Sequence, residues 1–240
     1  MKTIGAAIRA VVQRPAVWIP AALLMAATLV FWTTDLDVAL VRPFFSGYVV
    51  TSPRDGGVRE FPLQWVQPWK GLYNWGEYPA LILAGGGVAV WMASFLWKRL
   101  KPCRNAGLFY FLLLLIGPGI MVNCVFKPFW SRPRPQATVA FGGEREFLPV
   151  LQRGYGADDS SFPSGHAAVG FYLMAPAFVY WRRRPWLALA FVLFGLAAGA
   201  VIGLARMVAG GHFPSDVLWA GGIVYFTALA LAVPFRFGRE

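Results

Sequence analysis

Residues 106–126 read AGLFYFLLLLIGPGIMVNCVF and are followed directly by Lys127. This stretch has no charged residue and is long enough, as a helix, to cross the hydrocarbon core of a bilayer, which takes about 17–25 residues. Five other stretches have the same character. The six expected spans are Ala16–Thr34, Tyr78–Trp97, Ala106–Phe126, Ser164–Trp181, Trp186–Ala205 and Val217–Pro234. The sequence therefore predicts an all-α, polytopic membrane helix bundle with six transmembrane helices.

The composition of the whole chain agrees with this class. Of its 240 residues, 58% are hydrophobic and only 14% are charged, and the mean hydropathy is +0.54. Soluble domains carry about 25% charged residues, and a chain this short cannot bury such an apolar excess in an aqueous core. The same numbers exclude a disordered chain and a coiled coil, and two cysteines do not make a disulfide scaffold.

The distribution of charge predicts the orientation in the membrane. Twelve of the 22 Lys and Arg residues flank the expected spans on one side, where Glu240 is the single acid, and the other ten lie on the opposite side with ten acids. By the positive-inside rule the basic side faces the cytoplasm, so both termini are expected there. The net charge of +11 is then a topology signal, and we expect no nucleic-acid partner.

We expect one integral membrane domain over residues 1–240, with a core that carries the polar motifs at about 106–234. An outer segment, residues 35–77, contains Phe44, Phe45, Trp65, Trp69 and Trp75 together with four prolines. Such a segment cannot span, but it can lie at the interface with its aromatic rings at headgroup depth. Packing of this segment on the helix bundle and a role in gathering lipid both remain open at this point.

Three polar groups interrupt the apolar pattern, and the expected topology places all three at the outer face. They are Lys127 with Arg134-Pro135, then Pro163-Ser164-Gly165-His166, and finally Arg206 with His212 and Asp216. His166 and His212 are the only two histidines of the chain. One histidine can attack phosphorus while the other protonates the departing oxygen, and the cations stabilise charge on the phosphoryl oxygens. A carboxylate four residues after His212 can orient that ring. The groups therefore indicate phosphoryl transfer without a metal.

The three groups resemble the three-part signature of the type 2 phosphatidic acid phosphatase (PAP2) superfamily, which is K-x6-R-P, P-S-G-H and S-R-x5-H-x3-D. The first two parts match in full, and the third matches with Ala205 in place of the usual Ser. The resemblance covers Lys127–Asp216 by motif and the whole chain by its six-span layout, so a PAP2-like core is expected.

The resemblance implies a role for each matching residue. His212 would be the nucleophile that forms a phosphohistidine, Asp216 its orienting partner, and His166 the general acid. The phosphate would be held by Lys127, Arg134, Ser164, Gly165 and Arg206. No cofactor, metal ion or obligate protein partner is expected. Arg132 is an extra cation, for which a salt bridge at the rim with Glu144 or Glu146 is favoured over a phosphate contact.

We therefore expect a lipid phosphatase of the bacterial inner membrane whose active site faces the periplasm. Its substrate would be a phosphorylated membrane lipid: lipid A, phosphatidylglycerol phosphate, undecaprenyl pyrophosphate or phosphatidic acid. Lipid A is favoured, because Phe141-Gly142-Gly143 resembles a segment that follows the first motif in lipid A phosphatases of the superfamily. Two alternatives remain: a phosphotransferase that passes the phosphoryl group to an acceptor lipid, and an anion transporter. An anion transporter is disfavoured, because it needs polar or charged residues deep inside the spans, and the six expected spans contain almost none.

Overall fold

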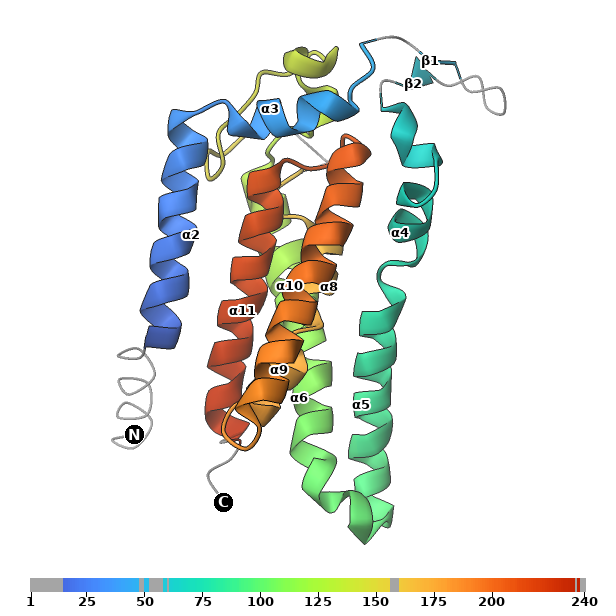
Figure 1. Ribbon diagram of the computed structural model, residues 1–240, viewed down its shortest axis with the longest axis vertical. Helices are drawn as coiled ribbons and strands as arrows, with labels where there is room; N and C mark the ends of the chain where they lie inside the picture. The colour runs from blue at the N-terminus through green and yellow to red at the C-terminus, as the bar shows by residue number, and fades with distance from the viewer. Residues whose placement is uncertain are drawn as a thin grey trace.

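The computed structural model describes residues 15–47, 50–51, 58–59, 61–155, 160–235 and 237. Its longer helices are α2 (Pro15–Thr33), α5 (Tyr78–Leu96), α6 (Arg104–Leu114), the π-helix η4 (Leu115–Phe126), α10 (Pro185–Val208) and α11 (Pro214–Phe235). Shorter helices are α3 (Leu36–Val41), α4 (Trp69–Trp75), α7 (Lys127–Trp130), α8 (Gly165–Tyr172) and α9 (Ala175–Tyr180). Strands β1 (Val50–Thr51) and β2 (Val58–Arg59) form a small antiparallel pair. The all-helical bundle that the sequence predicts is the observed architecture (Figure 1).

Five helical stretches of the described residues are long and apolar enough to cross a membrane. They are Pro15–Thr33, Trp69–Leu96, Lys98–Ala137, Pro185–Val208 and Pro214–Phe235. The expected span Ser164–Trp181 is instead divided into α8 and α9, with a break at Leu173 and Met174. Pro176 explains the break, because proline has no N–H to donate to the carbonyl of Tyr172 and its ring clashes with that carbonyl. A sixth crossing formed by α8 and α9 in succession stays a prediction.

The third span changes its helical geometry halfway. It begins as the α-helix α6 and continues as the π-helix η4, which contains Pro118. Because Pro118 cannot donate a hydrogen bond to the preceding turn, the regular α-helical ladder is lost around it and the helix widens. The distorted segment ends at Phe126, directly before Lys127, so the first polar motif begins where this irregular helix stops.

Helix α8 lies among α10, α11 and η4 and forms the centre of the bundle. The core around it is apolar, with Phe109, Leu113, Tyr172 and Ala220 all fully buried. Gly170 allows a close approach of α8 to α10, because a Cβ there would lie 2.8 Å from the Cα of Gly199. This packing fixes the position of the residue pair Gly165 and His166 at the start of α8.

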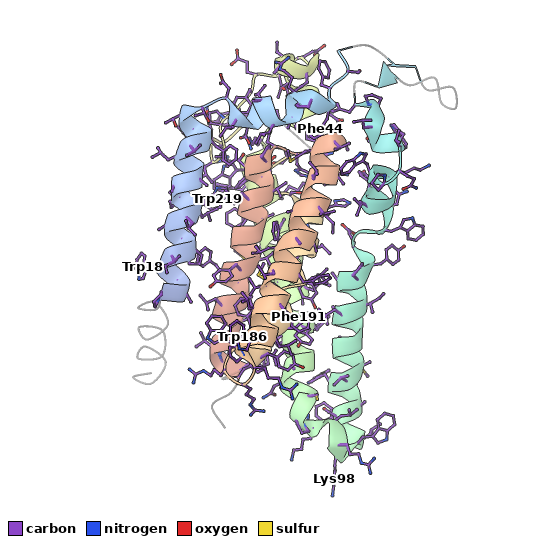
Figure 2. All side chains as sticks on the ribbon, viewed as in Figure 1. Trp18, Phe44, Lys98, Trp186, Phe191 and Trp219 are labelled. Carbon is purple, nitrogen blue, oxygen red and sulfur yellow. The ribbon has the colours of Figure 1, made fainter. Side chains whose placement is uncertain are left out.

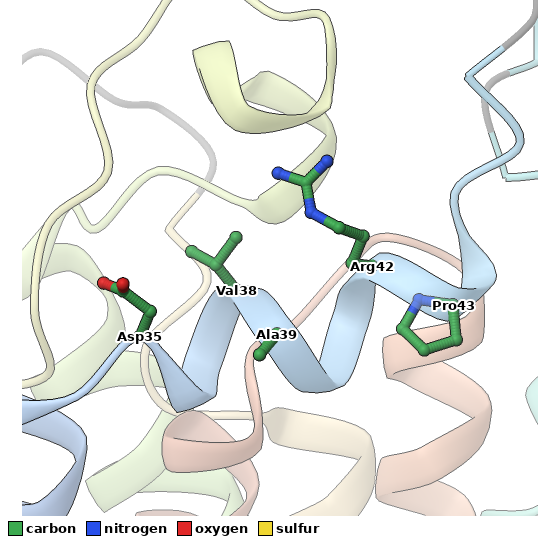
Figure 3. A pocket seen from close by; sticks show the side chains of 5 residues that line it. All are labelled: Asp35, Val38, Ala39, Arg42 and Pro43. Atoms are coloured by element: carbon green, nitrogen blue, oxygen red, sulfur yellow. The ribbon is translucent and has the colours of Figure 1, made fainter.

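Figure 1 shows that α3 lies across one end of the bundle, above α11. Its inner face buries Asp37 and Val41, and Val41 packs with Phe61, Phe141 and Phe213. Its outer face carries a shallow pocket that contains no candidate catalytic residue (Figure 3); the pocket is lined by Asp35, Val38, Ala39, Arg42 and Pro43. The described part of the outer segment 35–77 is therefore packed on the bundle, although Trp65 and Trp75 remain exposed. A role in gathering lipid stays a prediction.

The helix directions place the three motifs at one end of the bundle. The end of η4, the start of α8, the end of α10 and the start of α11 all lie at the end that α3 crosses (Figure 1). Lys98, one of the basic residues expected at the cytoplasmic side, is labelled at the opposite end in Figure 2. Lys2, Arg9, Arg14, Arg236 and Arg239 lie outside the described residues, so the location of the termini stays a prediction.

Candidate active site

The first motif leaves the helix as soon as it leaves the span. Lys127 is the first residue of α7, and that short helix ends at Ser131, which adopts a left-handed conformation with φ of 47°. Pro133 and Pro135 then prevent the helix from resuming, and Arg134 has extended backbone angles. The chain therefore turns across the end of the bundle and brings Arg132 and Arg134 to the third motif, where Gln136 donates a backbone hydrogen bond to Gly210.

The second motif begins α8 as the sequence predicts. Ser164 is the N-cap, and its Oγ accepts a hydrogen bond from the backbone N–H of Ala167 at 3.4 Å. Its own N–H donates to the carbonyl of Asp216 at 3.3 Å, which joins the second motif to the third. Gly165 lies close to η4, since a Cβ at this position would be 2.8 Å from Oδ1 of Asn123. The start of α8 is thus held against η4 and against the third motif.

His212 lies in the turn between α10 and α11 and is almost fully buried. Its Nδ1 is 2.5 Å from the backbone carbonyl oxygen of Ser161. A carbonyl oxygen only accepts hydrogen bonds, so Nδ1 carries the proton and Nε2 keeps its lone pair. That tautomer is the one a nucleophilic Nε2 requires.

Asp216 is near this ring, as expected, but does not hydrogen-bond to it. Its Oδ2 lies 3.8 Å from Nδ1 of His212, which is beyond hydrogen-bond length. Oδ2 instead accepts the N–H of Phe213 at 2.8 Å, and Oδ1 accepts a short hydrogen bond from Arg132. The sequence-based expectation assigned ring orientation to Asp216 alone. In the structure the Ser161 carbonyl accepts the hydrogen bond from the ring, and Asp216 acts on the ring only through its negative charge.

The surroundings keep His212 neutral over a wide range of pH. Burial lowers the pKa of His212 to about 4; the carboxylate of Asp216 opposes this shift, while the positive charges of Arg206 and Lys127 add to it. A neutral imidazole at physiological pH is the form that can attack an electrophile.

His166 is the second residue of α8, and its side chain remains 31% exposed. It interacts electrostatically with four other candidate residues, which are Arg206, His212, Lys127 and Arg134. The structure therefore brings His212 and the predicted cations Lys127, Arg134 and Arg206 within range of electrostatic interaction with His166. His166 is the more accessible of the two histidines, since His212 is almost fully buried.

Two residues that contact His166 were not identified from the sequence. Nε2 of His166 lies 3.4 Å from Oε1 of Glu77, and the rings of His166 and Tyr73 are 5.5 Å apart between centroids. Tyr73 also lies under Arg206, with 4.2 Å from the guanidinium carbon to the ring centroid. Both come from the outer segment, in and just after α4, where no spacing links them to the three motifs. An aromatic residue and an acid four positions apart are too common to indicate a site.

Arg206 lies in the last turn of α10 and is almost completely buried. Gly211 leaves room for its guanidinium group, because a Cβ at position 211 would be 2.9 Å from Nη2. The close approach explains a glycine next to His212. The guanidinium group is therefore in contact with the ring of Tyr73 and close to the backbone at Gly211.

The expected rim salt bridge of Arg132 is wrong. Arg132 is fully buried, and its Nη2 lies 2.8 Å from Oδ2 of Asp37, while Nη1 contacts Oδ1 of Asp216 at 2.5 Å. Glu144 and Glu146 are both exposed, whereas Arg132 faces inward, where its Nε donates to the carbonyl of Leu148. The physical reason is charge: two buried carboxylates outcompete exposed glutamates for a guanidinium group, because they cannot be solvated by water. Asp37 was also missed, since nothing near it resembles a motif.

Phe141-Gly142-Gly143 determines the conformation of its own loop, at the end of the 3-10 helix Val139–Phe141. Phe141 is fully buried, and its ring packs against Phe45 and Phe61. Gly142 has φ of 84°, a conformation that favours glycine, and a Cβ at Gly143 would collide with the backbone of Ala137. The short motif is therefore explained by the fold of this loop.

Within the described ranges, no group of three or more His, Cys, Asp or Glu residues is placed to hold a metal ion. Independence from metal stays a prediction, because it concerns the reaction.

The fold, the motif geometry and the comparison with protein families agree. The model of the PAP2 superfamily matches residues 106–238, which is more than half of the chain, and the protein belongs to that superfamily. Within it, the similar relatives are lipid A phosphatases. The chain is 41% identical over 135 residues to the lipid A 4'-phosphatase of Francisella tularensis subsp. novicida (strain U112), covering 55% of this chain and 60% of that protein.

Two rhizobial proteins with the same name are also similar. The lipid A 4'-phosphatase of Rhizobium leguminosarum is 36% identical over 120 residues, covering 48% of this chain and 50% of that protein. That of Rhizobium etli (strain ATCC 51251 / DSM 11541 / JCM 21823 / NBRC 15573 / CFN 42) is 35% identical over 120 residues, covering 48% of this chain and 45% of that protein. The chain thus matches about half the length of these relatives. No solved structure matches it.

Proposed function

We propose that this protein is a membrane lipid phosphatase that hydrolyses a phosphate ester of lipid A through a phosphohistidine at His212. The observation that carries the proposal is that both histidines lie within electrostatic range of each other and of Lys127 and Arg206 at one end of the bundle, with Arg134 also in range of His166. Membership of the PAP2 superfamily and the names of the similar relatives support the same activity and the same substrate.

In the first step, Nε2 of His212 attacks phosphorus and the bond from phosphorus to the ester oxygen breaks. Burial, with the neighbouring cations, lowers the pKa of His166 to about 4 in the free protein, so His166 takes up its proton when the anionic phosphate group binds beside it. It donates this proton to the ester oxygen, which leaves as an alcohol of the lipid. Nδ1 of His212 keeps its proton on the Ser161 carbonyl, so the phosphorylated ring is cationic. Lys127, Arg134, Arg206 and the N–H groups at the start of α8 stabilise the negative charge on the phosphoryl oxygens.

In the second step, His166 removes a proton from a water molecule whose oxygen attacks phosphorus. The bond between phosphorus and Nε2 breaks, inorganic phosphate forms, and both histidines return to their starting states. The half-exposed position of His166 supports this role, because the attacking water and the leaving alcohol must both reach it. A lipid hydroxyl in place of water would make the protein a phosphotransferase.

The proposed location is the bacterial inner membrane, with the site at the periplasmic face. Lys98 lies at the end opposite the site (Figure 2), and the positive-inside rule assigns such a basic flank to the cytoplasm. The lipid tails then stay in the bilayer while the phosphate enters between helix ends. Phosphatidylglycerol phosphate, undecaprenyl pyrophosphate and phosphatidic acid remain the alternative substrates.

The test uses the purified protein in detergent micelles with lipid A, the three alternative lipids and an acceptor phospholipid. Release of inorganic phosphate is measured together with the masses of all lipid products. We expect phosphate release that is fastest with lipid A and absent in His212→Ala. Dephosphorylation with equal phosphorylation of the acceptor lipid would indicate the phosphotransferase, and phosphate release by His212→Ala at the wild-type rate would contradict the proposal.

A further inference from the structure

Four polar side chains form a buried cluster that reaches His212 through Asp216, whose Oδ2 lies 3.8 Å from Nδ1 of His212. They are Asp37 of α3, Arg132 after α7, and Ser215 and Asp216 at the start of α11, and each is completely or almost completely buried. Oδ2 of Asp37 accepts hydrogen bonds from Arg132 Nη2 at 2.8 Å and from Ser215 Oγ at 2.6 Å. Oδ1 of Asp37 accepts the backbone N–H of Ser215 at 3.0 Å. Asp37 thereby fixes the first turn of α11.

Arg132 joins this aspartate to the candidate active site. Its Nη1 donates to both Ser215 Oγ and Asp216 Oδ1, at 2.9 and 2.5 Å, and its Nε donates to the carbonyl of Leu148. Buried charges are costly unless each is paired and hydrogen-bonded, and removal of one member leaves the others uncompensated. The cluster is thus a closed network in which the position of Asp216 depends on Asp37 through Arg132.

The charges of the cluster match the needs of the proposed reaction. With one guanidinium and two carboxylates ionised, the cluster has a net charge of −1. Arg132 and Asp216 alone would be neutral, so Asp37 supplies the negative charge that remains beside His212. That ring becomes cationic when Nε2 bonds to phosphorus with Nδ1 still protonated, and Oδ2 of Asp216 is 3.8 Å from Nδ1. A negative charge at that distance stabilises the cationic ring more than the neutral one.

We propose that Asp37 and Arg132 are positioning residues that hold Asp216 beside His212 and supply the excess negative charge that the cationic ring requires. The proposal rests on the proposed function above. It assigns a role to the N-terminal part of the chain, since Asp37 lies outside residues 106–238, which match the superfamily model. It also gives Arg132 a role that differs from phosphate binding, because its donors are directed at two carboxylates, Ser215 and Leu148.

The kinetic test compares Asp37→Asn, Arg132→Gln and Arg132→Lys with the wild type. Asn keeps the shape of Asp37 and its acceptor for the N–H of Ser215, but removes the charge. Asp35→Asn is the matched control, because Asp35 is exposed at the start of the same helix and its side chain makes no capping hydrogen bond. Each protein is first measured for thermal unfolding in detergent, so that only folded protein enters the kinetic comparison.

We expect kcat to fall about tenfold to a hundredfold in Asp37→Asn and Arg132→Gln with KM within about twofold, since a misplacement of about 1 Å can cost about a hundredfold in rate. Arg132→Lys should have a higher kcat than Arg132→Gln but a lower one than the wild type. Lysine keeps the positive charge but lacks the forked guanidinium group that reaches both carboxylates. Asp35→Asn should match the wild type. A folded Asp37→Asn with wild-type kcat, or a rise in KM alone, would overturn the proposal.

A second measurement does not depend on turnover. In ¹⁵N-histidine-labelled protein with His166→Asn, every ring signal belongs to His212. We expect Asp37→Asn to shift the ring nitrogen signals of His212 and Asp35→Asn to leave them unchanged. Unshifted signals in folded Asp37→Asn would contradict the positioning role. If the wild type releases no phosphate from any lipid while the signals shift as expected, the proposed function fails and the connection between Asp37 and His212 stands.

Discussion

Nδ1 of His212 lies 2.5 Å from the carbonyl oxygen of Ser161, whereas the nearest carboxylate oxygen of Asp216 is 3.8 Å away. The backbone of the segment before α8 therefore fixes the tautomer of the ring, and Asp216 acts on it through charge. This division of roles differs from a Ser-His-Asp triad, in which one carboxylate does both. It connects the second motif to the third, because Ser161 lies three residues before Ser164.

The tautomer should survive the loss of the carboxylate charge. Replacement of the triad aspartate by asparagine lowers kcat by about 10⁴-fold in a serine protease, because the wrong tautomer results. We expect Asp216→Asn to lower kcat by only about 10²-fold, and Nδ1 of His212 to remain protonated in ¹⁵N spectra. Steady-state kinetics and the spectra of the His166→Asn background check both points. Deprotonated Nδ1 in Asp216→Asn would show that the Ser161 carbonyl does not hold the proton.

His212 should stay neutral well below the pH at which an ordinary histidine titrates. Its pKa is lowered to about 4 from 6.5. Between these two values the unfolded chain binds one more proton at this residue than the folded chain does, so acidification from pH 6.5 toward 4 lowers the contribution of His212 to stability. A ¹⁵N titration of the His166→Asn protein should give a midpoint near pH 4. A midpoint at or above pH 6.5 would contradict the buried position of the ring.

Tyr73 should help to bind the phosphate group through Arg206. The ring supports the guanidinium group at 4.2 Å, and a cation–π contact of this kind contributes about 0.5–2 kcal/mol. Loss of this contribution corresponds to a rise in KM of roughly two- to thirtyfold in Tyr73→Ala, and we expect a smaller effect on kcat. Tyr73→Phe is the control, since it keeps the ring and removes only the hydroxyl. Equal KM values for the wild type, Tyr73→Phe and Tyr73→Ala would exclude this role.

Gly165 should be intolerant of even one added methyl group. A Cβ at this position would lie 2.8 Å from Oδ1 of Asn123, so Gly165→Ala must displace that side chain, whose Nδ2 donates to the carbonyl of Pro118 at 2.8 Å, at a cost of about 1–3 kcal/mol. We expect a lower Tm and lower activity, both partly restored by Asn123→Ala in the double variant. Gly85→Ala is the control, because nothing lies within 4 Å of its added Cβ. If Gly165→Ala unfolds at the wild-type temperature, the contact with η4 is not a constraint.

Much of the fold could be predicted from the sequence, because apolar length is a local property. Helices α2, α5, α10 and α11 begin and end within a few residues of the expected spans. The division of the fourth span into α8 and α9 was not predicted, although Pro176 indicates it. The span was predicted from its apolar length, and that length does not reveal the loss of a single backbone N–H. The start of α8 after Ser164 agrees with the expected span Ser164–Trp181, since apolar length also fixes where that span begins.

The site could be predicted only where its residues lie in spaced motifs. Lys127, His166 and His212 come together because each adjoins the end of a span at the same end of the bundle. Asp37 and Arg132 could not be paired in advance, since they are 95 positions apart and meet only when α3 crosses that end. Tyr73 and Glu77 were missed for the same reason. The Ser161 carbonyl is a backbone group that every residue type has, so its hydrogen bond with His212 could not be predicted from the sequence.

The most direct test of the account is to trap the covalent intermediate. Wild-type protein and the variants His212→Asn and His166→Asn are mixed with lipid A labelled in its phosphate groups, quenched in base within milliseconds to minutes, and digested for mass spectrometry. We predict a phosphorylated peptide with the group on His212 in the wild type and none in His212→Asn. A phosphoryl group on any other residue, or wild-type turnover with no covalent label at any time, would contradict the account.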